Sequence, residues 1–130
     1  MPTLVNILLA VAILPLALSF VGGYFRNKQF GTADNNNPRA QAGDLTGAGA
    51  RSYAAQQNAW EALAFFSAAL LAANLLEVAP AAMILPAYAF LACRILHAIF
   101  YLADIAALRS LVWILGTASC IWIFRLGFGS

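Results

Sequence analysis

Two groups of polar residues interrupt long apolar stretches of this 130-residue chain. Asn58 and Glu61 lie three positions apart in one stretch, and Arg94, His97 and Tyr101 follow at helical spacing in the next. A charge near the middle of a bilayer costs at least ~2.5 kcal/mol on insertion scales, so an ionisable residue there usually has a partner or a function. Cationic and aromatic donors opposite a carboxamide and a carboxylate leave an excess of positive charge. That excess suits an anionic ligand.

The composition indicates an all-α integral membrane protein, because 63% of the residues are hydrophobic and 9% are charged. A membrane-spanning helix needs roughly 20 mostly apolar residues, and four windows reach that length, at residues 4–25, 54–76, 81–102 and 110–128. We therefore predict one domain over residues 1–130, with helices at about 4–25, 51–77, 81–103 and 108–128 and a polar loop at 26–50. Short second and third connections predict an antiparallel four-transmembrane-helix bundle.

The basic residues predict how these helices are oriented in the membrane. With four spans, Arg125 falls near one surface, and the other side carries Arg26, Lys28, Arg39, Arg51 and Arg109. The positive-inside rule then places the first loop and the third turn in the cytoplasm and both termini on the opposite side. No lysine or arginine precedes the first window, which is longer than the ~7–15 residues of a signal-peptide core, so we expect a retained helix. The net charge of +2 is too small to indicate a nucleic-acid partner.

Glu61 and Arg94 are predicted to lie at matched depth. Glu61 is ten residues from Arg51, and Arg94 is ten residues from Asp104, which corresponds to ~15 Å along each helix. On an antiparallel pair of helices the two charges can form a buried ion pair. We expect this pair because each charge would otherwise be unpaired in hydrocarbon. A structural alternative stays open, in which these side chains only hold the helices together by hydrogen bonds.

Four short motifs follow one another along the chain: Asn37-Pro38-Arg39, the segment from Arg51 to Glu61 that contains Asn58, Arg94-x-x-His97-x-x-x-Tyr101, and Leu108-Arg109-Ser110. Each motif is weak alone. Their order and spacing resemble the MAPEG superfamily, the membrane-associated proteins in eicosanoid and glutathione metabolism. The resemblance covers the full chain.

The resemblance implies a homotrimer of four-helix protomers, with glutathione as a cosubstrate bound between neighbouring subunits in the cytoplasmic half of the membrane. Lipophilic electrophiles would reach its thiol from the bilayer lipids, and no metal is implied. The residues that would contact glutathione or line its pocket are Arg26, Arg51, Asn58, Glu61, Arg94, His97 and Tyr101. Arg26 and Arg51 are the candidates for binding its carboxylates at the mouth of the pocket. Arg109, or the hydroxyl group of Ser110, would stabilise the thiolate.

Thiol chemistry supports this role for Arg109. A free thiol with a pKa of ~8.5 is mostly protonated at neutral pH, and the thiolate is the nucleophile. Arginine stays protonated, so a fixed guanidinium in a water-poor pocket lowers the pKa of a bound thiol. His97 is either a hydrogen-bonding wall of the pocket or a general base. The chain's own thiols, Cys93 and Cys120, lie in apolar sequence and are expected to pack rather than react.

One departure from the family pattern bears on activity. Catalytic eicosanoid members usually carry further arginines between Arg51 and Asn58, where this chain has Ala54 and Gln57. Three classes of function therefore stay open: a glutathione-dependent transferase or peroxidase, a non-catalytic protein that binds lipid and presents it to a partner, and a small exporter. Small multidrug exporters carry their membrane carboxylate in the first helix, and residues 4–25 include no acidic residue.

Overall fold

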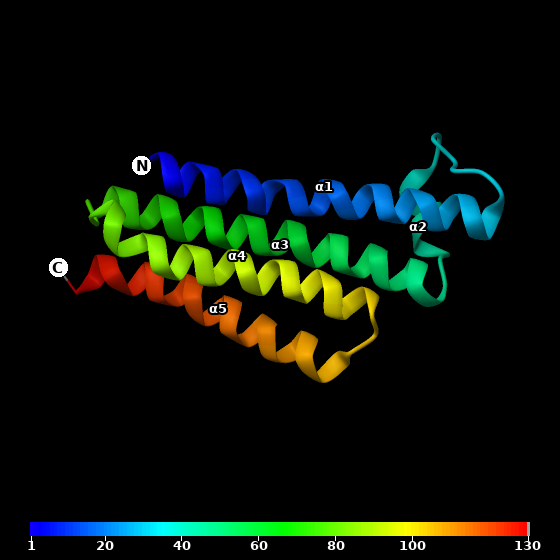
Figure 1. Cartoon of the computed structure of the whole chain (residues 1–130). Helices are drawn as coiled ribbons and strands as arrows, with labels where there is room; N and C mark the ends of the chain where they lie inside the picture. Colours follow the sequence, from blue (N-terminus) through cyan, green and yellow to red (C-terminus); the bar gives the residue numbers. More distant parts are fainter. Residues whose placement is uncertain (130) are drawn as a thin grey trace.

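The computed structural model describes residues 1–129, and the regular elements in that range are all helical, as predicted. α1 spans Pro2–Phe30, α2 Pro38–Gly43, α3 Gly47–Leu75, α4 Pro80–Leu102 and α5 Ala106–Phe128. The four long helices lie side by side in alternating directions, so the N- and C-termini are at the same end of the molecule (Figure 1). The short helix α2 lies at the other end.

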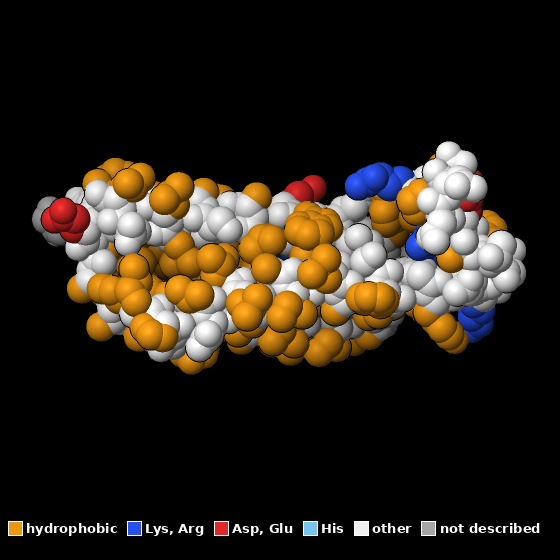
Figure 2. Space-filling view, turned by 90° about the horizontal axis from the view of Figure 1, so that it is seen from above, with side chains coloured by type: hydrophobic (Ala, Val, Ile, Leu, Met, Phe, Trp, Pro, Cys, Tyr) orange, Lys and Arg blue, Asp and Glu red, His pale blue; other side chains and the backbone are white. Residues whose placement is uncertain are grey.

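Three of the long helices, α1, α4 and α5, are long and apolar enough to cross a membrane. α3 is as long as α1, but its polar residues, Asn58 and Glu61 among them, lower its hydropathy. Figure 2 shows hydrophobic side chains along most of one face, while lysine and arginine side chains gather at the end that carries α2. The three apolar helices identify an integral membrane protein.

Helix α1 is longer than its apolar window. It continues through Arg26 to Phe30 and ends where Gly31 takes a left-handed conformation, with φ 82° and its N–H donated to the Asn27 carbonyl group. At ~1.5 Å per residue, 29 residues extend to about 43 Å, more than the ~30 Å hydrocarbon core of a bilayer. The loss of hydropathy at Arg26 therefore marks the edge of the apolar region, and the helix ends one turn later.

The segment between α1 and α3 is shorter and more ordered than the loop predicted at residues 26–50. α2 begins with Pro38 at its first turn, where a missing N–H costs nothing. The Asp34 carboxylate accepts the N–H groups of Asn36 at 2.8 Å and Asn37 at 3.1 Å. These bonds, with that from Asn37 the larger cause, hold the pKa of Asp34 below its usual value. The Gln41 amide donates to the Thr32 carbonyl group at 2.9 Å, so α2 is tied to the end of α1.

The two central helices, α3 and α4, separate α1 from α5. α3 and α4 each pack against both α1 and α5, and no contact joins α1 to α5 within the described residues. The core between them includes a stack of Phe66 on Phe90, with ring centroids 4.5 Å apart, and the fully buried Cys120 and Ile123. Cys120 packs in this core as predicted. One cavity lies between α1, α2 and α3, and two others lie between α3, α4 and α5.

Candidate functional site

Polar residues of α3 and α4 meet in a buried hydrogen-bonded cluster. The Nη2 group of Arg94 donates to the Oδ1 atom of Asn58 at 2.7 Å and lies 3.3 Å from the Nδ1 atom of His97. The exposed fraction is 5% for Arg94 and 3% for His97. The Asn58 amide donates in turn to a carboxylate oxygen of Glu61 at 3.4 Å. Asn58 therefore connects the guanidinium of α4 to the carboxylate of α3.

The expected direct ion pair between Glu61 and Arg94 is wrong. Among residues 1–129, the one ion pair joins Arg51 to Asp104, with 3.8 Å between nitrogen and oxygen. The sequence prediction counted ten residues from each helix end and so placed Arg94 opposite Glu61. In the structure Arg94 lies opposite Asn58, three residues or about 4.5 Å earlier on α3, which is an error of nearly one helical turn. Glu61 is exposed on the protomer. Within the described residues its contact with Arg94 is therefore indirect, through the amide of Asn58.

Helix α5 completes a pocket beside this cluster, which we call the Arg109 pocket. Its volume is about 330 Å³, and it is lined by Asn58 of α3, by His97 and Tyr101 of α4, and by Arg109, Ser110, Trp113 and Ile114 of α5. These elements bring five of the predicted site residues, far apart in the sequence, to one cavity.

Arg109 is held over an aromatic ring at the edge of this pocket. Its guanidinium carbon lies 4.4 Å from the centroid of the Tyr101 ring, within the range of a cation–π contact. The Tyr101 ring packs edge-on against His97, with 5.5 Å between ring centroids. Arg109 is half-buried and has no carboxylate partner in the described part of the chain. A cation fixed in this way can stabilise an anion that enters the cavity.

The chain was compared with sequence models of known protein families. The model of the MAPEG family matches residues 3–129. The chain belongs to the MAPEG family. This family includes glutathione transferases and peroxidases of membranes. No curated protein and no solved structure matched the chain.

A second cavity, which we call the inner pocket, lies next to the Arg109 pocket, toward the termini. Its volume is about 250 Å³, and it is lined by Asn58, Glu61, Ala62, Phe65, Phe90, Arg94, Trp113 and Thr117. It shares Asn58 and Trp113 with the Arg109 pocket. The two cavities therefore adjoin. Each has an arginine at its wall, Arg109 in one and Arg94 in the other, and the inner pocket adds the rings of Phe65 and Phe90.

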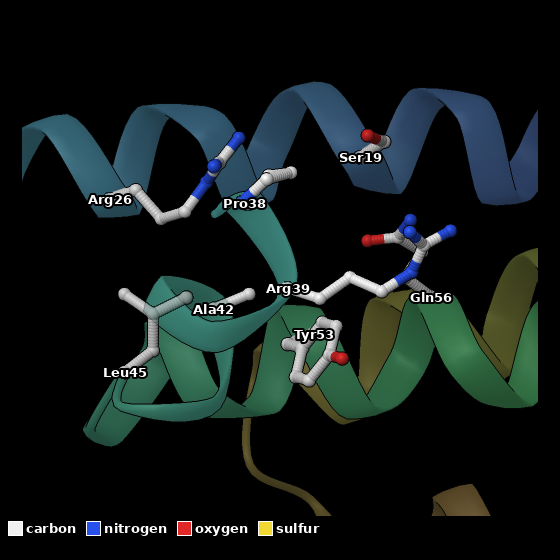
Figure 3. A pocket seen from close by; sticks show the side chains of 9 residues that line it. Ser19, Arg26, Pro38, Arg39, Ala42, Leu45, Tyr53 and Gln56 are labelled. Carbon is white, nitrogen blue, oxygen red and sulfur yellow. The ribbon is translucent and has the colours of Figure 1, made fainter. Parts of the chain in front are cut away.

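Two of the predicted site residues lie elsewhere. Arg51 pairs with Asp104, and its Nε atom is buried without a hydrogen-bond partner. Arg26 lines a third cavity, of about 210 Å³, between α1, α2 and α3 (Figure 3). Gln56 of that cavity and Asn58 of the Arg109 pocket are two residues apart on α3, so they point about 200° apart. One protomer alone does not bring Arg26 to the Arg109 pocket.

Two aromatic residues of the candidate site, Trp113 and Phe90, were missed in the sequence, whereas the helical spacing had already placed Phe65 on the face of Asn58 and Glu61. Trp113 lies one helical turn after Arg109, a spacing that places both on one face of a helix. Phe65 follows Glu61 at the same spacing on α3. The same spacing could have identified Trp113, whereas Phe90 becomes part of the wall only through the packing of α4 against α5.

The contact between Arg94 and His97 defines the form of the imidazole ring. An arginine side chain can only donate, so the Nδ1 atom of His97 is the acceptor. The neutral ring then carries its hydrogen on Nε2. Since one nitrogen already accepts and the other is protonated, this geometry favours His97 as a hydrogen-bond donor over a general base.

Proposed function

We propose that this MAPEG protein is a membrane-bound enzyme that activates glutathione for transfer to lipophilic electrophiles or for reduction of lipid hydroperoxides. The observation that carries the proposal is the Arg109 pocket. There a half-buried cation, without a carboxylate partner in the described residues, lies beside Ser110, Tyr101 and His97. Such a pocket suits a small anionic thiol.

Arg109 would act by stabilising the glutathione thiolate. Its guanidinium stays protonated, and a cavity that excludes water strengthens its field at the sulfur. After the thiol proton passes to solvent, the sulfur forms a bond to the electrophilic carbon, and the leaving group departs with the electron pair of the broken bond. With a hydroperoxide, the thiolate sulfur bonds to the distal oxygen while the O–O bond breaks, and the alkoxide takes a proton from solvent and leaves as an alcohol. A second glutathione then reduces the sulfenic acid, which yields glutathione disulfide and water.

The inner pocket would hold the lipophilic substrate. Phe65, Phe90 and Trp113 provide apolar walls, as expected of a site that takes its ligand from lipid. Trp113 lies at the junction with the Arg109 pocket. A substrate carbon near Trp113 would therefore be close to a thiolate held by Arg109.

We propose a homotrimer in which neighbouring subunits complete the glutathione site. Glu61 lies fourteen residues from each end of α3 and is exposed on the protomer. A charge facing lipid at that depth costs at least ~2.5 kcal/mol, so contact with a second subunit would remove a substantial penalty. Arg26, on another face of α3 from Asn58, would contact glutathione only across such an interface.

We also propose that α1, α3, α4 and α5 all span the membrane. The end with α2 would face the cytoplasm, because basic residues gather there. These residues are Arg26, Lys28, Arg39, Arg51 and Arg109. Both termini would then face the opposite side, and the mouth of the Arg109 pocket would open to the cytoplasm.

The proposal is tested by conjugation of glutathione to an aryl halide by purified protein in detergent. We expect Arg109→Leu to keep glutathione affinity but to slow conjugation at neutral pH by about tenfold for each unit by which the thiol pKa rises. Arg109→Lys should be intermediate and Ser110→Ala milder. Because the thiol of the leucine variant titrates closer to ~8.5, its rate should keep rising with pH after that of the parent has levelled off.

Arg125→Leu is the matched control, since Arg125 is an exposed arginine of the same helix, near its other end. This variant should keep the parent rate. Full conjugation activity in Arg109→Leu at neutral pH would refute the assignment of Arg109.

A non-catalytic role in lipid binding is the second candidate, and one observation favours it. Ala54 and Gln57 occupy positions where catalytic eicosanoid members usually carry arginines, so two carboxylate anchors are absent from this helix. Under this candidate the purified protein would bind lipid but no glutathione. Absence of glutathione binding in the parent protein would select this candidate over the enzyme.

A further inference from the structure

The ion pair between Arg51 and Asp104 joins the start of α3 to the turn between α4 and α5. Its nitrogen and oxygen atoms are 3.8 Å apart, beyond the ~2.7–3.2 Å of a hydrogen bond from an N–H group to oxygen. Asp104 therefore offsets the charge of Arg51 without accepting a hydrogen bond from it. The Nε atom of Arg51 is buried and has no hydrogen-bond partner within residues 1–129. A buried donor without an acceptor is unfavourable, so Asp104 satisfies Arg51 only in part.

This ion pair lies at the end of the Arg109 pocket that faces α2. On α3, Arg51 precedes the pocket residue Asn58 by seven positions, or two turns, so both lie on one face and are ~10 Å apart along the helix. On the other side, Asp104 lies in the chain between the pocket residues Tyr101 and Arg109. The turn between α4 and α5 is at the same end of the molecule as α2 (Figure 1). The pair is therefore placed at the mouth of the pocket.

The carboxylate of Asp104 is held loosely, whereas its backbone is held firmly. The exposed fraction of the side chain is 67% for Asp104 and 29% for Arg51, and exposed ion pairs stabilise a protein little. The backbone of Asp104 has a left-handed φ of 60° and donates its N–H to the Tyr101 carbonyl group at 3.2 Å. Ile105 donates to the Phe100 carbonyl group at 2.9 Å. The carboxylate can therefore leave Arg51 without loss of the turn.

A peptide ligand of the Arg109 pocket is long enough to reach Arg51. An extended tripeptide measures about 10–11 Å, at ~3.3–3.6 Å per residue. That length matches the ~10 Å from Asn58 to Arg51 along α3. With its thiol at Arg109, glutathione would therefore bring a carboxylate to the mouth of the pocket. Such a carboxylate can accept hydrogen bonds from both the Nε atom and an Nη atom of Arg51, which Asp104 does not.

We propose that Asp104 competes with glutathione for Arg51. Asp104 pairs with Arg51 until a carboxylate of glutathione takes its place and accepts the hydrogen bond of the Nε atom. This inference rests on the proposed function and adds a residue that sets the affinity for the peptide. Arg51 must leave one carboxylate before it binds the other, so Asp104 weakens the binding of glutathione. A residue that merely held the helices around the pocket in place would strengthen it instead.

The test is calorimetric titration of glutathione into the purified protein in detergent. Asp104→Asn is expected to lower the Kd for glutathione about three- to fivefold, which is the effect of removing one exposed ion pair that competes with the ligand. Arg51→Gln should raise the Kd, because the guanidinium group is lost. When both changes are combined, the Kd should equal that of Arg51→Gln alone, because Asp104 then has no arginine to compete for.

Asparagine has the shape of aspartate and tolerates the left-handed backbone of this turn, so Asp104→Asn keeps the fold, and circular dichroism verifies its helix content. Asp44→Asn is the matched control, since Asp44 is another exposed aspartate at the end with α2. It should keep the Kd of the parent. Glutathione diethyl ester is the matched ligand, because both of its carboxylates are masked. The parent and Asp104→Asn should bind this ester equally.

A Kd in Asp104→Asn that equals or exceeds that of the parent would overturn the inference, while glutathione binding by the parent would still support the proposed function. A gain in affinity that persists in the Arg51→Gln background, or that extends to the diethyl ester, would also overturn it, because the carboxylate would then act by general repulsion. If neither the parent nor Asp104→Asn bound glutathione, the inference and the proposed function would fail together.

Discussion

Arg94 is a buried cation whose direct hydrogen-bond partners in the described chain are neutral side chains. Asn58 supplies a carboxamide oxygen and His97 a ring nitrogen. A buried charge is tolerated when its hydrogen bonds are satisfied. The same bonds orient His97 and join α4 to α3, so Asn58 supports the wall of both pockets.

At this scale, Asn58→Ala is predicted to destabilise the protein. The change removes the acceptor of a bond from a charged donor, which typically contributes ~1.5–3 kcal/mol. Glu61→Gln should have a smaller effect, because Glu61 is exposed and has no direct bond to Arg94. Thermal unfolding in detergent measures both effects.

Gln57→Ala is the control for this prediction, since Gln57 is an exposed neighbour on the same helix. Equal melting temperatures for Asn58→Ala and Gln57→Ala would contradict the bridging role of Asn58. A loss in Glu61→Gln as large as that in Asn58→Ala would instead favour a direct pair with Arg94.

Residues that share one helix face were predictable, and their partners on other helices were not. Spacing alone groups Asn58 with Glu61, and His97 with Tyr101. Asn58 and Glu61 are less than one helical turn apart on α3. To tell which of them contacts Arg94, the position of α4 along α3 must be known to within a turn. That position comes from core packing, such as the stack of Phe66 on Phe90, which the sequence pattern does not specify.

At the scale of the elements, the close approach of α5 to α4 positions the Arg109 pocket. A Cβ atom on Gly116 would lie 3.2 Å from the Cβ atom of Cys93, so the two helices meet closely at this point. Arg109, Ser110 and Trp113 lie on the same helix. Any shift of α5 away from α4 would therefore change the pocket.

We predict that Gly116→Leu destabilises the protein by about 1–3 kcal/mol, because the added side chain overpacks this contact. Conjugation activity should fall with it. Ala118→Leu is the control, since Ala118 is exposed on the same helix and should tolerate the change. Unfolding in detergent compares the two variants. A Gly116→Leu protein as stable as Ala118→Leu would show that the contact is not close-packed.

The elements themselves were only partly predictable. Long apolar windows located the four long helices, but hydropathy falls at Arg26, whereas α1 ends at Phe30 before Gly31. Hydropathy shows where the apolar region ends. A helix, however, ends where its backbone hydrogen bonds end, and in α1 that point lies one turn after Arg26. The short helix α2 has six residues and no apolar repeat, so periodicity could not predict it.

At the scale of the whole molecule, a single protomer leaves one mid-helix carboxylate and many large apolar side chains exposed. Glu61 is exposed at the middle of α3, and large apolar side chains are exposed along α1. Lipid can cover the apolar side chains, but a carboxylate at that depth needs a polar partner. Beyond the Asn58 amide, the proposed oligomer would supply such a partner, and the polar residues within apolar stretches of the sequence already indicated this requirement.

We predict that the purified protein is a homotrimer. Native mass spectrometry and chemical cross-linking in mild detergent should both give a trimer as the largest abundant species. Prior unfolding in a denaturing detergent should abolish the cross-links, which controls for random collision. Monomers or dimers alone in mild detergent would contradict the prediction and would leave Glu61 without a partner subunit.

The central claim is that the Arg109 pocket binds glutathione as a thiolate, and ultraviolet thiolate absorbance during a glutathione titration tests it most directly. At neutral pH we expect a saturable thiolate signal with the parent protein. Arg109→Leu should saturate at similar glutathione concentrations with a much smaller signal, because the bound thiol stays protonated without the guanidinium. An equal thiolate signal in the parent and in Arg109→Leu, or none with the parent, would contradict the account.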